Sequence, residues 1–554
     1  MKVRVLPLVC LLLAFWPSSL TALVLPELHF YTWDSGDNST LWERPANWVG
    51  DVTPPSSPNT GVAFGTGAQT LVNVVETRVL SQMRFDANAQ SFTLKSGTLE
   101  FASPGGGDFP LLQQLSSNGQ WIQSEVSLKT GLIVITSGAG ALQLSGNLQG
   151  SGPLVKEGSG GDLVLAGNNF AFNGNIEINT GTVRAASSSA LGDATGKTRV
   201  APGATLSVGS QTPGANLIIS EPISVAGNGV GGNGAINNLH LSNTLSGRLT
   251  LEDHARVQSS SGVLTLSGGV SGDGKTLTVG GAGNVVVNGA IATGSGGLVK
   301  EGTGTLTLAA PNSFQGPTTL LGGTILLQAM QVFSDTSAIT VSQTSILDLN
   351  GFSETVGSLL GAGTVDFDGA VLTLASGTSS FGGQFTGAGT LLIKEGASLS
   401  LDAAFNAPNL NIILDGGTLL LGSGQQHQFG NLLISGNSVL DFGNSGSTSV
   451  LFSTVGAEAG NVLTVENWTH ALDYFFVQNN PGAQGTAPTN QVDFTGTPID
   501  TWTGDDTRWL AYANTTYGQL TPVPEPSTYG ALLLSACAGF VVYRRRRAAK
   551  RSAA

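Results

Sequence analysis

The sequence has little cysteine, little charge and few aromatic residues. It holds two cysteines, Cys10 and Cys537, and only 11% of its 554 residues are charged and 7% aromatic. Because both cysteines lie near the ends, the body must fold without disulfide bonds, metal-thiolate sites or a cysteine nucleophile. No apolar pattern with the period of an amphipathic helix occurs between residues 30 and 520, so we expect little helix.

Motifs that carry catalysis or hold a cofactor are also missing. No Gly-x-Ser-x-Gly elbow, phosphate-binding loop or His-Glu-x-x-His motif occurs, so none of these common sites is present. The histidines are far apart, without the spacing of metal ligands, and we expect each on the surface or in a turn: His29, His240, His254, His427 and His470. We therefore expect no catalytic residue, cofactor or metal, and predict that the protein is not an enzyme.

Basic residues are scarce in the body. Removing the eight basic residues of the two ends and Glu525 from the totals of 23 and 36 leaves 15 basic and 35 acidic residues in 23–522, a net charge of −20. Such a body repels nucleic acid and anionic membrane surfaces. We therefore expect no nucleic-acid partner.

Glycine is abundant, with 78 residues, and it separates short runs of alternating aliphatic and polar residues. Glycine supplies positive φ at a corner, and the alternation puts one face of a strand in a core. Gly-Thr-aliphatic triplets recur as strand starts, at residues 97, 181, 304, 323, 363, 389 and 417. We predict an all-β fold, a right-handed parallel β-helix over residues 92–460. An antiparallel sandwich or propeller is the alternative, although regular hairpin signals are missing.

One unit of sequence is repeated. Residues 150–184 and 294–326 share a Leu-Val-Lys-Glu-Gly start, a β run, an Asn-aromatic-Gly turn and a Gly-Thr-aliphatic restart, and a weaker third copy spans 392–421. Repetition of this kind indicates stacked turns of one solenoid. Each copy carries a charged pair: Lys156-Glu157, Lys300-Glu301 and Lys394-Glu395. Because a catalytic site does not come in three copies, we expect solvated turn pairs that discourage edge association.

The segments that flank the repeats differ from them. Residues 23–91 contain Trp33, Trp42 and Trp48, and we predict an N-terminal cap in which they cover the open end of the stack. A carbohydrate-stacking platform is the alternative for these tryptophans. In residues 461–520 aromatic residues return, which predicts a C-terminal cap with its own small core.

Both ends of the chain carry export signals. Residues 1–22 have Lys2 and Arg4, then an apolar run and small residues, which predicts a secretory signal peptide. Residues 521–554 contain Pro524, Glu525 and Pro526, then an apolar stretch from Tyr529 to Tyr543, and then Arg544, Arg545, Arg546 and Arg547. The apolar stretch is a short membrane helix, and its basic stop stays cytoplasmic, which leaves the body on the other side.

The tail resembles a PEP-CTERM sorting domain, because the Pro-Glu-Pro signature, the short membrane helix and the arginine cluster follow in that order. The resemblance implies processing by an exosortase in a Gram-negative-type bacterium that makes exopolysaccharide, with the helix holding the precursor in the membrane until then. The repeats are similar to the autotransporter-associated β-strand repeat. The second copy follows that pattern closely, the first departs from it at 162–165, and the third lacks the Asn-aromatic-Gly turn. Autotransporters continue into an outer-membrane domain where this sequence has the sorting tail, so we do not expect self-translocation.

Together these features predict an exported bacterial protein of the cell envelope, cell surface or extracellular matrix. We expect a structural or adhesin-like role, sorting by exosortase through the tail, and extracellular polysaccharide as the partner. The alternative is a carbohydrate-active enzyme, a polysaccharide lyase or hydrolase, on the same scaffold. Such an enzyme needs carboxylates or basic residues clustered on adjacent turns.

Overall fold

The computed structural model describes residues 29–105, 107–444, 446–469, 472–478, 491–495, 507–511 and 518–522. Their secondary structure is β-strand, apart from two short 3-10 helices, η1 (Pro45–Asn47) and η2 (Val230–Gly232). No helix in these ranges is long and apolar enough to cross a membrane. The predicted signal peptide, 1–22, and nearly all of the predicted sorting segment, 523–554, lie outside the described residues.

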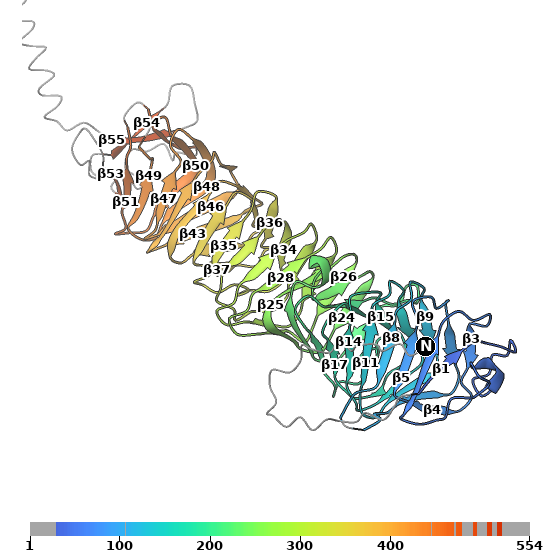
Figure 1. Ribbon diagram of the computed structural model, residues 1–554. Coiled ribbons are helices and arrows are strands. Elements are labelled where there is room, and N and C mark those ends of the chain that lie inside the picture. Colours follow the sequence, from blue (N-terminus) through green and yellow to red (C-terminus); the bar gives the residue numbers. More distant parts are fainter. Residues whose placement is uncertain are drawn as a thin grey trace, which may run out of the picture. The chain divides into compact units, whose positions relative to one another are not determined.

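The chain forms two compact units, one of residues up to 163 with 171–174, the other of 164–170 with 175 onward. In the first unit each strand pairs in parallel with the equivalent strand one turn later (Figure 1). One ladder contains β1 (His29–Trp33), β2 (Thr60–Phe64), β5 (Gln82–Phe85), β8 (Leu111–Gln114), β11 (Leu132–Thr136) and β14 (Leu154–Glu157). The second contains β3 (Leu71–Asn73), β6 (Thr93–Lys95), β9 (Gln120–Ile122) and β12 (Leu142–Leu144). The third contains β4 (Thr77–Leu80), β7 (Thr98–Phe101), β10 (Glu125–Leu128), β13 (Leu148–Gly150) and β16 (Ala171–Phe172).

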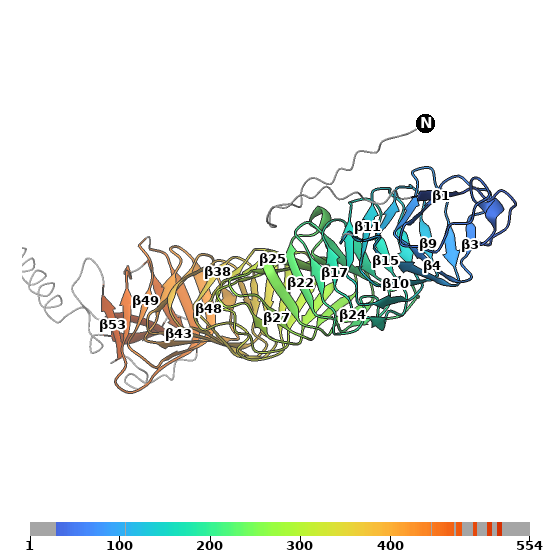
Figure 2. The ribbon, with the colours of Figure 1, turned by 60° about the horizontal axis from the view of Figure 1, so that its bottom comes forward.

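The second unit is built in the same way, and Figure 2 shows its strands β22, β25 and β27 side by side. One ladder contains β17 (Ile176–Ile178), β19 (Thr198–Val200), β22 (Ile223–Gly227), β25 (Leu249–Ser259), β27 (Val270–Ser271) and β30 (Ile291–Ala292). Another contains β21 (Ile218–Ile219), β24 (Ser242–Leu245), β26 (Val263–Leu266), β29 (Asn284–Val287), β32 (Thr305–Leu308), β34 (Gly323–Leu327), β36 (Ser345–Asp348), β39 (Thr364–Asp366) and β42 (Gln384–Thr386).

Two further ladders complete this unit. One contains β18 (Thr182–Ala185), β20 (Thr205–Val208), β23 (Ile236–Asn238), the second half of β25, β28 (Leu277–Gly280), β31 (Leu298–Lys300), β33 (Thr318–Leu320), β35 (Ala338–Val341), β38 (Ser358–Gly361), β41 (Gly377–Phe381), β44 (Ala397–Leu401), β47 (Thr418–Leu421), β49 (Ser438–Asp441), β51 (Leu463–Glu466) and β53 (Val492–Thr495). The other contains β37 (Glu354–Val356), β40 (Val371–Leu374), β43 (Gly389–Lys394), β46 (Leu410–Asp415), β48 (Gln426–Ile434), β50 (Ser449–Ala457) and β52 (Tyr474–Val477).

Alternation along each strand builds the core. Leu306, Ile325, Leu347 and Val365 are register partners on successive turns of the second unit, and each is 0% exposed. Glycine is required at the corners: Gly323 has a φ of +69°, and a Cβ there would lie 2.4 Å from a neighbouring carbonyl oxygen. The predicted all-β parallel solenoid is confirmed, because ladders between turns replace the hairpin pairings of the sandwich or propeller alternative.

The parallel stack ends in antiparallel strands. β52 pairs antiparallel with β55 (Gly518–Pro522), and β55 pairs antiparallel with β54 (Thr507–Ala511). An added pair of strands of this kind covers the edge that a parallel ladder leaves open. The limits of the two predicted caps, at residues 91 and 460, remain predictions.

Candidate functional site

The repeat lysines of the first two copies lie inside the core. Lys156 is 0% exposed and Lys300 is 2% exposed. In β14 and β31 the burial alternates so that the leucine and the lysine point inward and the valine between them points outward. The prediction of solvated turn pairs is therefore wrong for these two lysines, because each occupies an inward-facing position of its strand.

Backbone carbonyls surround each buried amine. Lys156 Nζ donates to the carbonyl oxygens of Glu157 at 2.9 Å and Gly158 at 2.6 Å. Lys300 Nζ donates to the oxygens of Glu301, Gly302 and Gly322 at 2.8, 3.0 and 3.1 Å. Since the Gly322 oxygen belongs to the next turn, the Lys300 ammonium ties two turns together.

Burial lowers the pKa of both lysines to about 8. A lysine with a lowered pKa is suited to act as a base or a nucleophile. No substrate reaches either amine, however, because both side chains are buried beneath the turn. Their hydrogen bonds instead satisfy carbonyls that the corner would otherwise leave buried without a donor. The repeat lysines are thus structural.

In the third copy the alternation along the strand is shifted by one residue, so that the lysine faces outward. Lys394 is exposed at the end of β43, where Leu391 and Ile393 are the buried residues. Its register partner on the next turn is Asp415, which is also on the outer side of its strand. In this copy the predicted solvated position of the lysine is confirmed.

The three tryptophans of the N-terminal segment are buried, at 1% exposure for Trp33, 1% for Trp42 and 0% for Trp48. Trp48 meets the other two rings edge to face, with centroids 5.2 Å from Trp33 and 4.8 Å from Trp42. Trp48 Nε1 also donates to the Trp42 carbonyl oxygen at 2.7 Å. A carbohydrate platform needs an exposed ring face, so that alternative is wrong for these residues.

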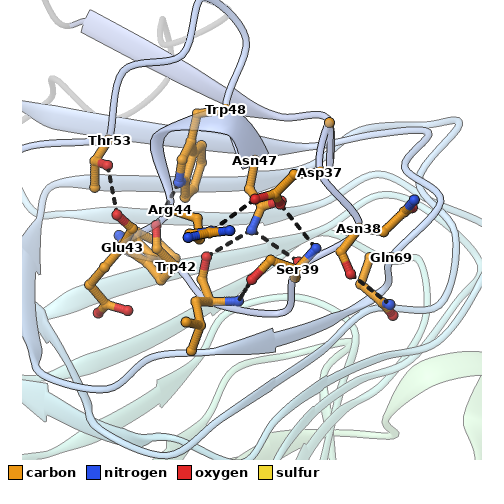
Figure 3. Close-up of polar contacts among 12 residues, drawn as sticks. Asp37, Asn38, Ser39, Trp42, Glu43, Arg44, Asn47, Trp48, Thr53 and Gln69 are labelled. Atoms are coloured by element: carbon orange, nitrogen blue, oxygen red, sulfur yellow. Dashed lines mark hydrogen bonds and ion pairs between the residues drawn. The ribbon is translucent and has the colours of Figure 1, made fainter.

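A short polar loop holds the tryptophans in place (Figure 3). The buried Asn47 side chain donates to the carbonyl oxygens of Ser39 and Leu41, both at 2.9 Å. Arg44 pairs with Asp37 at 2.8 Å on the outer side of the loop. These contacts fix η1 beside β1, where Trp48 forms an isolated antiparallel bridge with Trp33. The loop therefore covers the free edge of the first strand.

Two groups of charged side chains in the second unit come near to what the enzyme alternative requires. Asp348 and Asp366 are register partners on adjacent turns, and burial, followed by the charges of Asp366 and Asp368, raises the pKa of Asp348. The other group has Glu177 and Arg199 on adjacent turns and Glu252 two turns beyond Arg199. Arg199 is 2.8 Å from Glu252 and 4.0 Å from Glu177, and their side chains are 41%, 34% and 34% exposed. Burial raises the pKa of Glu177. The guanidinium nevertheless lies within ion-pairing distance of both carboxylates, and the open position leaves all three side chains in contact with water. This arrangement is that of a surface salt bridge.

The described residues offer no metal site, since none of their His, Cys, Asp and Glu side chains form a group of three or more that could hold an ion. His427 is 3% exposed and packs beside the rings of Phe405 and Phe429, with centroids 6.1 and 6.3 Å away. The expected surface position is therefore wrong for His427, which takes an inward position of β48 in an aromatic column. His29 and His254 are exposed and His240 is half-buried, whereas His470 lies outside the described residues.

Comparison with known proteins supports the repeat. A family model, the Passenger-associated-transport-repeat, matches residues 154–185 and 298–327, which contain the two buried lysines. The Adhesin BmaC autotransporter of Brucella suis biovar 1 (strain 1330) is 31% identical over 297 residues, which cover 50% of this chain but 8% of that relative.

Two proteins of Escherichia coli (strain K12) match shorter stretches. The uncharacterized protein YuaQ is 38% identical over 86 residues, 15% of this chain and 6% of the relative. The uncharacterized lipoprotein YdeK is 34% identical over 113 residues, 19% of this chain and 8% of the relative. The chain thus spans only a small part of each relative. No solved structure matches it.

Proposed function

We propose that this chain is an exported, non-enzymatic bacterial surface protein of the structural or adhesin-like kind. Residues 1–22 direct export. The tail, with Pro524, Glu525 and Pro526 ahead of the apolar stretch and the arginines, is the substrate of an exosortase. The mature body then resides on the cell surface or in the extracellular matrix, where it contacts extracellular polysaccharide.

The observation that carries this proposal is the passenger-type repeat on a parallel solenoid. The family model covers two copies, and a relative named as an autotransporter adhesin is similar over half of the chain. A solenoid presents many equivalent polar positions along its turns, and such positions favour weak multivalent contacts. The acidic, lysine-poor body disfavours anionic partners.

Incubation of the purified protein with the producing cell's own polysaccharide tests the proposal. We expect the protein to co-sediment with the polysaccharide, whose chain length stays unchanged by size-exclusion chromatography. Release of oligosaccharides would instead support the polysaccharide lyase or hydrolase alternative. In that case Arg199→Ala, which removes the cation of the surface cluster, is the first variant to assay for loss of cleavage.

A further inference from the structure

The ladder that begins at β21 is interrupted after β42. β42 pairs with β39 on one side. On the next turn, β45 (Asn406–Ala407) pairs with β48, but no backbone hydrogen bond joins β42 to β45 within the described part of the chain. Two facing strand edges are therefore open at this turn of the second unit.

The backbone of both strands directs polar groups into this gap. The Gln384 N–H and the Thr386 carbonyl bond to the preceding turn, at Gly363 and Phe367. Because backbone groups alternate along a strand, the N–H and carbonyl of Phe385 point to the other side. The Phe405 carbonyl accepts from Gln428 of the following turn, so the backbone groups of the next residue, Asn406, point back toward β42.

The gap forms a groove of about 300 Å³. The rings of Phe385 and Phe405 lie beneath the groove and are themselves buried, at 6% and 3% exposure. The side chains of Gln384 and Asn406 stand exposed at its rim, with Thr386 beside them. No lining side chain is charged, and the sequence has no lysine or arginine between Lys394 and Arg508.

These features limit which kind of ligand the groove can hold. An inserted peptide strand needs about 4.7–4.9 Å to each neighbour, but the two rings are in contact, with centroids 4.9 Å apart, and hold the turns together. The volume is at the lower end of small-ligand sites. Rim carboxamides and the backbone groups of the two open edges each offer donors and acceptors, as hydroxyl groups require. A ligand that is rich in hydroxyl groups and carries no charge matches these features.

We infer that this groove binds one uncharged sugar residue of a polysaccharide chain. The inference rests on the proposed function, in which extracellular polysaccharide is the partner, and it assigns the contact to one place on the solenoid. Its polar contacts are the Gln384 and Asn406 amides together with the backbone groups of the two open edges.

Binding of the full-length chain, held in detergent, to the producer's polysaccharide tests the inference. The polysaccharide is first separated by anion exchange into a neutral and an acidic fraction. Ala404→Phe places a ring in the groove from an exposed lining position. The matched control, Ala292→Phe, makes the same change at an exposed alanine of β30. A double variant, Gln384→Ala with Asn406→Ala, removes the rim amides without filling the groove.

We expect the wild type to bind the neutral fraction. Ala404→Phe and the double variant should each weaken binding by at least about tenfold, while Ala292→Phe binds as the wild type does. Equal binding by all four proteins would overturn the groove assignment and leave the proposed function in place. Binding of the acidic fraction alone would overturn the uncharged ligand. A wild type that binds neither fraction would overturn both the groove and the polysaccharide partner.

Discussion

Replacement of Lys300 by methionine tests whether the buried repeat lysine stabilises its turn. Methionine keeps most of the apolar stem but removes the Nζ atom, which donates to three backbone carbonyls. Lys394→Met is the matched control, since it makes the same change in the same Lys-Glu-Gly sequence at an exposed position. We expect the first variant to be destabilised and the second to be nearly neutral.

The expected loss of stability in Lys300→Met follows from two opposing contributions. Hydrogen bonds from a charged donor contribute about 1.5–3 kcal/mol each, so three of them contribute roughly 5 kcal/mol or more. Against this, lowering the lysine pKa from 10.5 to about 8 corresponds to about 3 kcal/mol of cost for the buried charge. The hydrogen-bond contribution exceeds the cost of burying the charge by about 2 kcal/mol, so Lys300→Met should lower the free energy of unfolding by about that amount. The exposed Lys394→Met should stay within about 0.5 kcal/mol.

Amide hydrogen exchange gives the local readout that a repetitive fold needs, because each turn has its own opening free energy. A loss of about 2 kcal/mol accelerates exchange about 30-fold in the strands around Lys300, β31 to β34. Distant turns, such as those around β47 and β49, serve as an internal reference and should exchange as in the wild type. Equal exchange in Lys300→Met and Lys394→Met would refute the reasoning.

The pH dependence of denaturant unfolding provides a second check. Folded Lys300 loses its proton near pH 8, whereas the unfolded side chain keeps its proton to about pH 10.4. The unfolded state therefore binds more protons between these values, and the wild type gains stability as the pH rises from 8 to 10. Lys300→Met should lose this residue's share of the gain, while Lys394→Met retains it.

Three further substitutions probe other buried groups. Burial lowers the pKa of His427 to about 4, so stability should fall as the pH drops from 6.5 to 4. His427→Phe should raise the thermal midpoint and make it less dependent on pH in this range. An unchanged dependence of the midpoint on pH would contradict this. Burial raises the pKa of Glu221 from 4.5 to about 8, so stability should fall by up to about 5 kcal/mol as pH rises between these values. Glu221→Gln should remove most of that loss in urea titrations at pH 5 and 8. Trp48→Ala leaves a cavity in the N-terminal core and should lower the free energy of unfolding by about 3–5 kcal/mol. The loss should be visible as faster proteolysis near β1 and β2. If β1 stays protected from the protease, the tryptophans do not stabilise this end.

The solenoid was predictable because its signals are local. A Gly-Thr-aliphatic start combines a corner that needs positive φ with a strand of period two, and Gly323 shows both features in the structure. Parallel pairing followed from the missing hairpin turns. The buried tryptophans were one of two predictions for that segment, and burial was decided by the loop around Asn47, whose contacts reach Ser39 and Leu41.

The position of the repeat lysines was not predictable from their own residues. Lys156, Lys300 and Lys394 are each followed by Glu-Gly, yet only the first two are buried. A shift of one residue in the alternation moves a side chain from the core to the surface, and the aliphatic pair before each lysine fits both phases. In the third copy the additional Leu391 takes an inward position, which leaves the lysine outside. The groove after β42 was equally hidden, because it arises where two turns fail to pair.

The intact mass of the protein recovered from the producing cell's surface and medium tests the proposed export and sorting most directly. The proposal predicts a mass that lacks residues 1–22 and everything after about Pro526, with any additional mass belonging to what the new end is joined to. A mass that still contains Arg544, Arg545, Arg546 and Arg547 would contradict processing by an exosortase.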